Sequence, residues 1–239
     1  MNDLKISIIG YGKMGKEIES LALKRKIKVV SIIDPLETSS YEYKIISKES
    51  LGNAEICIDF TNPEVVLENI RKMAELKKNI VIGTTGWNEH LKEVKDIVDS
   101  NNIGLIYSPN FSIGVNLYMK LIQTASDIIG TKEIYDIFGD EMHHQGKKDS
   151  PSGTARELKR IIKEFSGENI NFTSTRAGNI IGEHIVGFDS EYDSIEITHR
   201  AKNRKGFAEG ALLASKFIKD EKGFYTQKDF LNYLIREEN

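Results

Sequence analysis

A glycine-rich turn close to the amino terminus constrains the fold of this chain more than any other feature. The apolar run Lys5–Ile9 leads directly into Gly10–Gly15, which has glycine at its first, third and sixth positions, and a helical pattern follows. A second apolar run, Lys28–Ile33, then ends in Asp34. Strand, turn, helix and strand form a β-α-β unit, which favours a parallel sheet with a right-handed crossover.

The same turn is typical of a dinucleotide-binding loop. Glycines allow the backbone to approach a pyrophosphate, and the start of the helix supplies N–H donors and positive potential. Asp34 follows about 20 residues later, where an acid can accept hydrogen bonds from the adenosine ribose. The alternative is a structural turn beside a surface aspartate. The dinucleotide interpretation assigns cofactor contacts to Gly10, Gly12, Lys13, Met14, Gly15 and Asp34.

Strands and helices alternate over the first half of the chain, as in a doubly wound α/β fold. Further strands are expected at 54–60, 79–82 and 103–107, with helices after Asn62-Pro63 and at 89–100. We therefore predict a Rossmann domain built on a parallel sheet. A helical pattern returns from Gly206 onward, and we expect this tail to fold back onto the Rossmann domain.

The second half of the chain has a different pattern. A long helix is expected at 112–129, a strand at 134–138, a polar histidine-rich loop, a helix at 155–165 and two antiparallel strands at 180–188 and 193–199. This indicates a second, smaller α+β domain. We predict a dinucleotide-binding domain of residues 1–111 plus 207–239 and a second domain of residues 112–206.

Two polar turns of the first domain are candidates for ligand contact. Gly83–Gly86 and Ser108–Phe111 each follow the carboxyl end of a predicted strand. In open α/β sheets, ligands bind at that edge. Either segment taken alone is equally well explained as a plain turn.

The run from Glu141 to Ala155 concentrates groups that can carry chemistry. It contains His143, His144 and Lys147 and ends at a predicted helix start, Ser152-Gly153-Thr154. Imidazole transfers protons near neutral pH, lysine neutralises a carboxylate, and N–H groups at a helix start bind anions. The run therefore suits a dicarboxylate substrate that receives a proton.

The same run has two plainer interpretations, a metal site and a solvated loop. Side chains of adjacent histidines in an extended chain point apart, and no second His/Cys cluster has zinc spacing, so we expect no metal. A merely solvated polar loop is the plain alternative. Lys148 is interpreted as a solvated surface charge.

Composition narrows the class of protein. With 29% charged residues and a net charge of −3, nothing indicates nucleic-acid or membrane binding. No apolar stretch approaches the roughly 20 residues of a membrane-spanning helix, and no signal peptide is visible. We therefore expect a cytoplasmic protein. The single cysteine, Cys57, lies in an apolar run and is interpreted as a buried hydrophobe rather than a catalytic thiol.

The run from Glu141 to Ala155 resembles the E-x-H-H-x-x-K-x-D-x-P-S-G-T-A signature of 4-hydroxy-tetrahydrodipicolinate reductases. The glycine turn, Gly83–Gly86, Ser108–Asn116 and Ile197–Ala201 also match this family, in the same order. The resemblance spans nearly the whole chain. It implies transfer of a hydride from NADH or NADPH to dihydrodipicolinate or its hydroxylated precursor, in a homotetramer that associates through the second domain.

The resemblance also implies roles for individual residues. His143 matches the proton donor, and Lys147 matches a lysine that assists protonation and contacts the substrate. The substrate carboxylates are expected to contact His144, Ser152, Gly153 and Thr154. The nicotinamide half of the cofactor is expected to contact Gly83, Thr84, Thr85, Ser108, Asn110 and Phe111.

Two departures from the family bear on cofactor choice. Pro35 and Asn62 stand where members that grip NADPH often carry a basic residue, and the segment between Asp34 and Ala54 is short for the family. We expect NADH to be preferred, with NADPH possible through Lys13 or Lys44. Two other functions remain as alternatives: an amino-acid dehydrogenase of similar build, such as aspartate or diaminopimelate dehydrogenase, and a non-enzymatic dinucleotide sensor.

Overall fold

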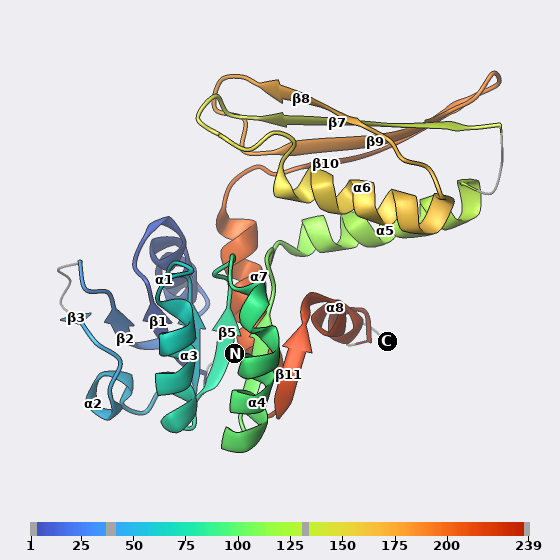
Figure 1. The fold of residues 1–239 in the computed structure, drawn as a ribbon. Coiled ribbons are helices and arrows are strands. Elements are labelled where there is room, and N and C mark those ends of the chain that lie inside the picture. The colour runs from blue at the N-terminus through green and yellow to red at the C-terminus, as the bar shows by residue number, and fades with distance from the viewer. Residues whose placement is uncertain (1–3, 37–41, 131–133, 237–239) are drawn as a thin grey trace. The chain divides into compact units, whose positions relative to one another are not determined.

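The computed structural model describes residues 4–36, 42–130 and 134–236, and the chain forms two compact units (Figure 1). Unit 1 comprises residues 1–113 and 205–239, and unit 2 comprises residues 114–204. Each junction differs by two residues from the predicted domain boundary.

Unit 1 is built on a seven-stranded parallel sheet in the order β11-β6-β5-β4-β1-β2-β3. Strand β1 therefore lies between β2 and β4, which places the switch in strand order beside the glycine turn. The strands are β1 (Lys5–Ile9), β2 (Lys28–Ile33), β3 (Glu42–Tyr43), β4 (Ile56–Asp59), β5 (Asn79–Ile82), β6 (Gly104–Tyr107) and β11 (Gly223–Thr226).

Helices cover both faces of this sheet. They are α1 (Lys13–Lys24), α2 (Lys48–Leu51), α3 (Val66–Glu75), the short 3-10 helix η1 (Asn88–His90), α4 (Leu91–Asn101), α7 (Lys205–Ile218) and α8 (Gln227–Arg236). On one face Ile8 packs with Ile18 of α1 and Ala211 of α7. On the other, Ile9 packs with Ile70 of α3. The Rossmann fold class and the return of the tail to unit 1 are thus confirmed.

Unit 2 is a four-stranded sheet, ordered β10-β9-β7-β8, with two helices on one face (Figure 1). Its elements are α5 (Ile113–Ile129), β7 (Asp136–His143), α6 (Gly153–Ser166), β8 (Phe172–Arg176), β9 (Glu183–Asp189) and β10 (Ser194–Arg200). Strands β7, β9 and β10 are antiparallel neighbours, and β8 runs parallel to β7. Tyr118, Leu158 and Phe188 contribute to its core.

Several predicted element boundaries were wrong. Strand β7 continues to His143 instead of ending at Phe138, because both β8 and β9 pair with its second half. Glu141 and His143 therefore lie on a strand and not in a loop. Strands β3, β8 and β11 and the short helix α2 were missed. The tail after Gly206 is consequently two helices separated by a strand, which begins at Gly223 with a φ of +104°.

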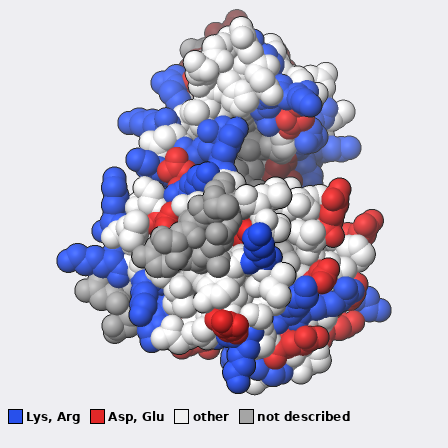
Figure 2. Space-filling view, turned by 90° about the vertical axis from the view of Figure 1, so that its left-hand side faces the viewer, with Lys and Arg blue, Asp and Glu red and all other residues white. Residues whose placement is uncertain are grey.

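The surface charges, the helix hydropathy and the single cysteine do not indicate a particular function. Figure 2 shows basic and acidic side chains intermixed with uncharged surface on the face in view. Among the residues that the structure describes, no helix is both long and apolar enough to span a membrane. Cys57 is fully buried, and burial raises the pKa of its thiol to about 12, in line with a packing role.

Candidate active site

The three glycines of the turn differ in what a side chain at each position would meet. Gly10 has a φ of +86°, and a Cβ there would lie 2.7 Å from the carbonyl oxygen of Phe60. A Cβ on Gly15 would lie 2.3 Å from the carbonyl oxygen of Gly10. By contrast, a Cβ on Gly12 would meet no atom within 4 Å. Packing therefore explains two of the glycines, whereas the third borders open space in which a ligand can approach the backbone.

The start of helix α1 is suited to an anion. Its N-cap is Gly12, which offers no side-chain acceptor to the first turn. The N–H groups of a first turn have no intrahelical acceptor, and the helix dipole places positive potential there. A pyrophosphate fits these donors and the open space beside Gly12.

A cavity of about 420 Å³ lies at this edge of the sheet. It brings the glycine turn together with the segment after β5 and adds a segment after β4, of which only Asn62 had been related to the cofactor from the sequence. The lining residues are Gly12, Lys13, Met14, Phe60, Thr61, Asn62, Pro63, Gly83, Thr84 and Thr85. The position of Phe60–Pro63 just beyond a predicted strand was the signal that could have identified it.

Asp59 at the end of β4 organises this edge. Its fully buried Oδ1 accepts hydrogen bonds from the backbone N–H and hydroxyl of Thr61 (2.9 and 2.7 Å) and from the hydroxyl of Thr84 (2.9 Å). Its Oδ2 accepts from the amide of Asn69 on α3 (2.9 Å). Burial raises the pKa of Asp59, and the hydrogen bonds from Thr61, Asn69 and Thr84 counteract part of that rise.

Other predicted cofactor residues contribute in less direct ways. Asp34 accepts hydrogen bonds from the backbone N–H groups of Tyr11 (2.7 Å) and Leu36 (2.8 Å), which fixes the carboxylate beside the glycine turn. The hydroxyl of Thr84 is engaged by Asp59, so a ligand contact from Thr84 would come from its backbone.

The Ser108–Phe111 segment does not line the cavity. The buried hydroxyl of Ser108 donates to the carbonyl oxygen of Asn110 (2.8 Å). Phe111 is only 2% exposed, and its ring centroid lies 6.1 Å from that of Phe60. These side chains shape the turn and support the cavity wall.

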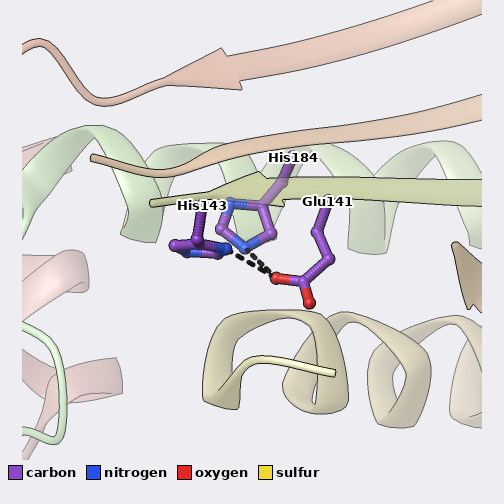
Figure 3. Close-up of side chains that lie close together, drawn as sticks. All are labelled: Glu141, His143 and His184. Atoms are coloured by element: carbon purple, nitrogen blue, oxygen red, sulfur yellow. Dashed lines mark ion pairs between the residues drawn. The ribbon is translucent and has the colours of Figure 1, made fainter. Parts of the chain in front are cut away.

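Unit 2 contains a buried cluster centred on Glu141 of β7 (Figure 3). Glu141 Oε1 accepts hydrogen bonds from three donors: the backbone N–H of Ser152 (3.0 Å), the hydroxyl of Ser174 (2.7 Å) and Nη2 of Arg176 (2.7 Å). Glu141 Oε2 lies 2.8 Å from Nδ1 of His143 and 3.9 Å from Nε2 of the third residue drawn, His184 on β9.

The electrostatics of the cluster follow from burial and from its ion pairs. Burial alone would raise the pKa of Glu141, but the donors Arg176, Ser174 and Ser152 together lower it to about 2. Burial lowers the pKa of His143 below its usual value, opposed by Glu141 and assisted by Lys147 and Arg176. Burial lowers the pKa of His184 to about 4. Glu141 is thus a carboxylate at neutral pH, and the protonated form of His143 is a stronger acid than an ordinary imidazolium.

The remaining predicted residues of unit 2 lie in the loop after β7 and at the start of α6. Lys147 Nζ lies 2.7 Å from Oδ1 of Asp149, with about a quarter of the lysine side chain exposed. Ser152 is the N-cap of α6: its Oγ accepts from the N–H of Ala155 (3.1 Å) and lies 3.1 Å from Nε2 of His184.

The other residues predicted to bind the substrate are accessible to a ligand. Gly153 is exposed and Thr154 is partly exposed in the first turn of α6, and His144 is also partly exposed. The structure therefore offers the groups that an anionic ligand would require at this helix start.

Glu141, His143 and His184 also offer three possible metal-ligand atoms within 4.8 Å of one another. The sequence analysis expected no metal and did not foresee this grouping. The Arg176 guanidinium bound to the same carboxylate opposes a second cation, and Ser152 occupies the near side of His184. We therefore assign the cluster to proton chemistry and not to a metal.

Sequence reasoning missed four residues of this cluster: Glu141, Ser174, Arg176 and His184. Glu141 stood at the head of the singled-out run but received no role. Ser174 and Arg176 lie on β8, which was not predicted at all. His184 lies on a predicted strand, and an isolated polar residue in a strand gives no signal of the partners that it meets across the sheet.

Comparison with known proteins decides the family. The family model described as "Dihydrodipicolinate reductase, N-terminus" matches residues 4–111, and the model described as "Dihydrodipicolinate reductase, C-terminus" matches residues 114–231. The chain belongs to the dihydrodipicolinate reductase family. The resemblance found in the sequence is thereby confirmed.

Individual members of the dihydrodipicolinate reductase family are similar over almost their full length. A 4-hydroxy-tetrahydrodipicolinate reductase from Christiangramia forsetii is 34% identical, over 98% of this chain and 100% of the relative. One from Methanococcus aeolicus is 35% identical, over 95% and 87% respectively. Among solved structures, the dipicolinate-bound dihydrodipicolinate reductase from Paenisporosarcina sp. TG-14 has a TM-score of 0.80 at 25% identity, covering 93% of this chain and 97% of that one.

The dehydrogenases considered as alternatives share only the fold with this reductase family member. The diaminopimelate dehydrogenase of C. glutamicum has a TM-score of 0.54 at 10% identity, with 100% of both chains covered. The aspartate dehydrogenase of Thermotoga maritima has a TM-score of 0.52 at 12% identity, covering 92% of this chain and 97% of that one.

Proposed function

We propose that this chain reduces dihydrodipicolinate, or its hydroxylated precursor with loss of the hydroxyl as water, to tetrahydrodipicolinate with a nicotinamide cofactor, in lysine and diaminopimelate biosynthesis in the cytoplasm. The observation that carries the proposal is the buried Glu141–His143 pair beside the start of α6, in a chain of the dihydrodipicolinate reductase family. The pair offers a proton source, and the helix start offers donors for a carboxylate.

Unit 1 holds the cofactor in this proposal. The turn around Gly12 and the first turn of α1 bind the pyrophosphate, and Asp34 accepts from the adenosine ribose. The backbone around Gly83–Thr85 borders the nicotinamide end of the cavity. When bound, the reduced nicotinamide supplies a hydride.

Unit 2 holds the substrate and supplies the proton. His144, Gly153 and Thr154 contact the substrate carboxylates, and the Lys147 ammonium compensates their charge. His143 donates the proton that accompanies the hydride and is reprotonated from solvent. Ser152 caps α6 and thereby keeps its first-turn N–H groups in place.

NADH is the preferred cofactor in this proposal. A 2′-phosphate would lie close to the Asp34 carboxylate, and like charges at close range repel each other. Pro35 and Asn62 provide no cation there. Lys13 and Lys44 are exposed and leave NADPH possible at lower efficiency.

We also propose that the chain assembles into a homotetramer through unit 2. Helices α5 and α6 cover one face of its sheet, and none of the residues that the structure describes in this unit forms a layer over the other face (Figure 1). Strand β10 is an edge strand, which natural proteins protect by pairing or by covering.

Oxidation of the cofactor in the presence of freshly made synthase product tests the proposal. We expect the absorbance of the reduced nicotinamide to fall with either cofactor. When both are measured at the same ionic strength, kcat/KM should be higher for NADH than for NADPH. Oxidation that depends on an amino acid and ammonia, with none on the synthase product, would favour the dehydrogenase alternative. Cofactor binding without any turnover would favour the sensor. A clear NADPH preference would mean that a lysine reaches the 2′-position.

A further inference from the structure

The Glu141 carboxylate is buried among the residues proposed for proton transfer and has no role in binding either ligand. We propose that Glu141 is a positioning residue that holds Nδ1 of His143, so that Nε2 of the same ring is the atom that transfers the proton. This inference deepens the proposed function, because it rests on His143 as the proton donor.

The position of the His143 ring supports this assignment of its two nitrogens. Nδ1 is buried 2.8 Å from Glu141 Oε2, and the described residues offer it no other acceptor. The two atoms lie at hydrogen-bonding distance, although the ring N–H is not aligned with the oxygen, and they form an ion pair only when the ring is protonated. A carboxylate beside Nδ1 favours the tautomer that keeps a proton there. Only Nε2 then remains to exchange a proton with a ligand.

The environment of Nε2 is consistent with that role. A Cβ built on Gly182, just before β9, would lie only 3.0 Å from Nε2 of His143. Gly182 does not adopt a positive φ, so its backbone conformation would also admit alanine. The missing side chain therefore matters chiefly for the space it leaves beside Nε2.

Glu141 is itself held in place by donors from two other elements. Ser152 at the start of α6 and Ser174 and Arg176 on β8 all donate to Oε1. Because these three donors occupy the same oxygen, Oε2 remains directed at the His143 ring (Figure 3). The helix start that would bind the substrate and the ring that would protonate it are thus fixed by one carboxylate.

The charged and titratable groups that face His143 are Glu141 on the same strand, Lys147 in the following loop, Arg176 on β8 and His184 on β9. Lys147 and Arg176 disfavour the imidazolium, as does burial. Glu141 is the group that favours it. Loss of this negative charge should therefore make His143 harder to protonate.

Nitrogen NMR of the histidine rings tests the proposal without requiring activity. The chain has five histidines, so the His143 signals can be assigned with His143→Ala. We expect neutral His143 to carry its proton on Nδ1 in the unsubstituted protein. In Glu141→Gln the proton should move toward Nε2, and the pKa of the ring should fall by about one unit. Wild-type His143 protonated on Nε2 would overturn the proposal before any variant is made.

Steady-state kinetics give a second readout. Glu141→Gln should lower kcat by about tenfold or more, as loss of an orienting carboxylate does in other enzymes, with little change in the KM for NADH. The loss of kcat toward high pH should begin at a lower pH. Glu157→Gln removes an equal charge from a solvent-accessible site on α6. It should change neither kcat nor the pH at which kcat begins to fall. An unshifted pH profile in Glu141→Gln would contradict the proposal.

Gly182→Ala covers the case in which Glu141→Gln does not fold. It alters no charge and should preserve the tautomer while lowering kcat, because the new methyl crowds Nε2. Unchanged kcat in Gly182→Ala would place proton transfer elsewhere.

The reductase function and the positioning role of Glu141 can be refuted separately. An inactive wild-type protein with the predicted tautomers refutes the reductase function alone, whereas an active one in which Glu141→Gln leaves the tautomer unaltered refutes the positioning role alone.

Discussion

Single residues of the two sites differ in how far the sequence could identify them. Gly12 and His143 stood in motifs whose residue types and spacing indicate chemistry, and the structure places Gly12 beside open space and His143 beside a buried carboxylate. Arg176 and His184 could not be found in the same way. They reach Glu141 from other strands, and strand pairing between distant segments leaves no local trace in the sequence.

His143 is the residue whose loss we expect to be most selective. His143→Ala should lower kcat by about 10²–10⁴-fold, the usual contribution of a general acid. NADH affinity, measured by fluorescence titration, should barely change, because His143 belongs to unit 2 and the cofactor cavity lies in unit 1. His90→Ala, at a partly exposed histidine of unit 1, is the control and should retain wild-type kcat. A near-normal kcat in His143→Ala would remove this residue from the mechanism.

At the scale of elements, the sequence predicted the five central parallel strands of unit 1 well, because they are continuous apolar runs bounded by turns, but it missed the two edge strands β3 and β11. It failed where polar residues are buried on a strand. The second half of β7 contains Glu141 and His143, which read as a loop until their partners on neighbouring strands are known. Strand β8 has a Thr-Ser-Thr run between Phe172 and Arg176 and has no strong apolar signal.

The carboxyl end of β4 provides a prediction at this scale. Asp59 joins the turns after β4 and β5 to helix α3, so Asp59→Ala should leave three donor side chains and one backbone N–H without their acceptor. An unsatisfied buried donor costs roughly 1–3 kcal/mol. Asp59→Asn preserves an acceptor oxygen and should cost much less. In urea unfolding at pH 7, the wild type and Asp59→Asn should therefore have similar free energies of unfolding. That of Asp59→Ala should be much lower.

The pH dependence of Asp59→Asn gives a sharper comparison. The folded-state pKa of Asp59 is raised, so the folded protein binds the proton more tightly than the unfolded chain does. This contribution to stability falls as pH rises from the unfolded pKa through the folded one. The free energy of unfolding of Asp59→Asn minus that of wild type should accordingly increase between acidic and neutral pH. Asp96→Asn, at an exposed acid of α4, should lack this trend. A difference that stays constant with pH would show that Asp59 does not titrate as inferred.

At the scale of the whole molecule, the division into two units was predictable from the change in pattern near residue 112, and the return of the chain near residue 206 was predictable from its helical period. The proposed tetramer rests on the family resemblance, because the residue pattern itself does not indicate a quaternary structure. A sheet face looks the same in a sequence whether solvent or another subunit covers it, and here that face mixes apolar side chains with charged ones. Phe138, for example, lies over Gly187, on the opposite side of the sheet from the core residues Val186 and Phe188.

The proposed tetramer gives the last prediction. Ile185 alternates with Val186 along β9 and therefore points away from the helices, onto the face that lacks a covering layer. Lysine at this position should place a charge in the interface while sparing the unit 2 core. Light scattering at micromolar concentration should give four times 27.0 kDa for the wild type and a smaller mass for Ile185→Lys. Leu23→Lys changes an exposed leucine of α1 in unit 1 and should keep the tetramer mass. A wild-type monomer would refute the assembly, and a tetrameric Ile185→Lys would show that the subunits associate through a different surface.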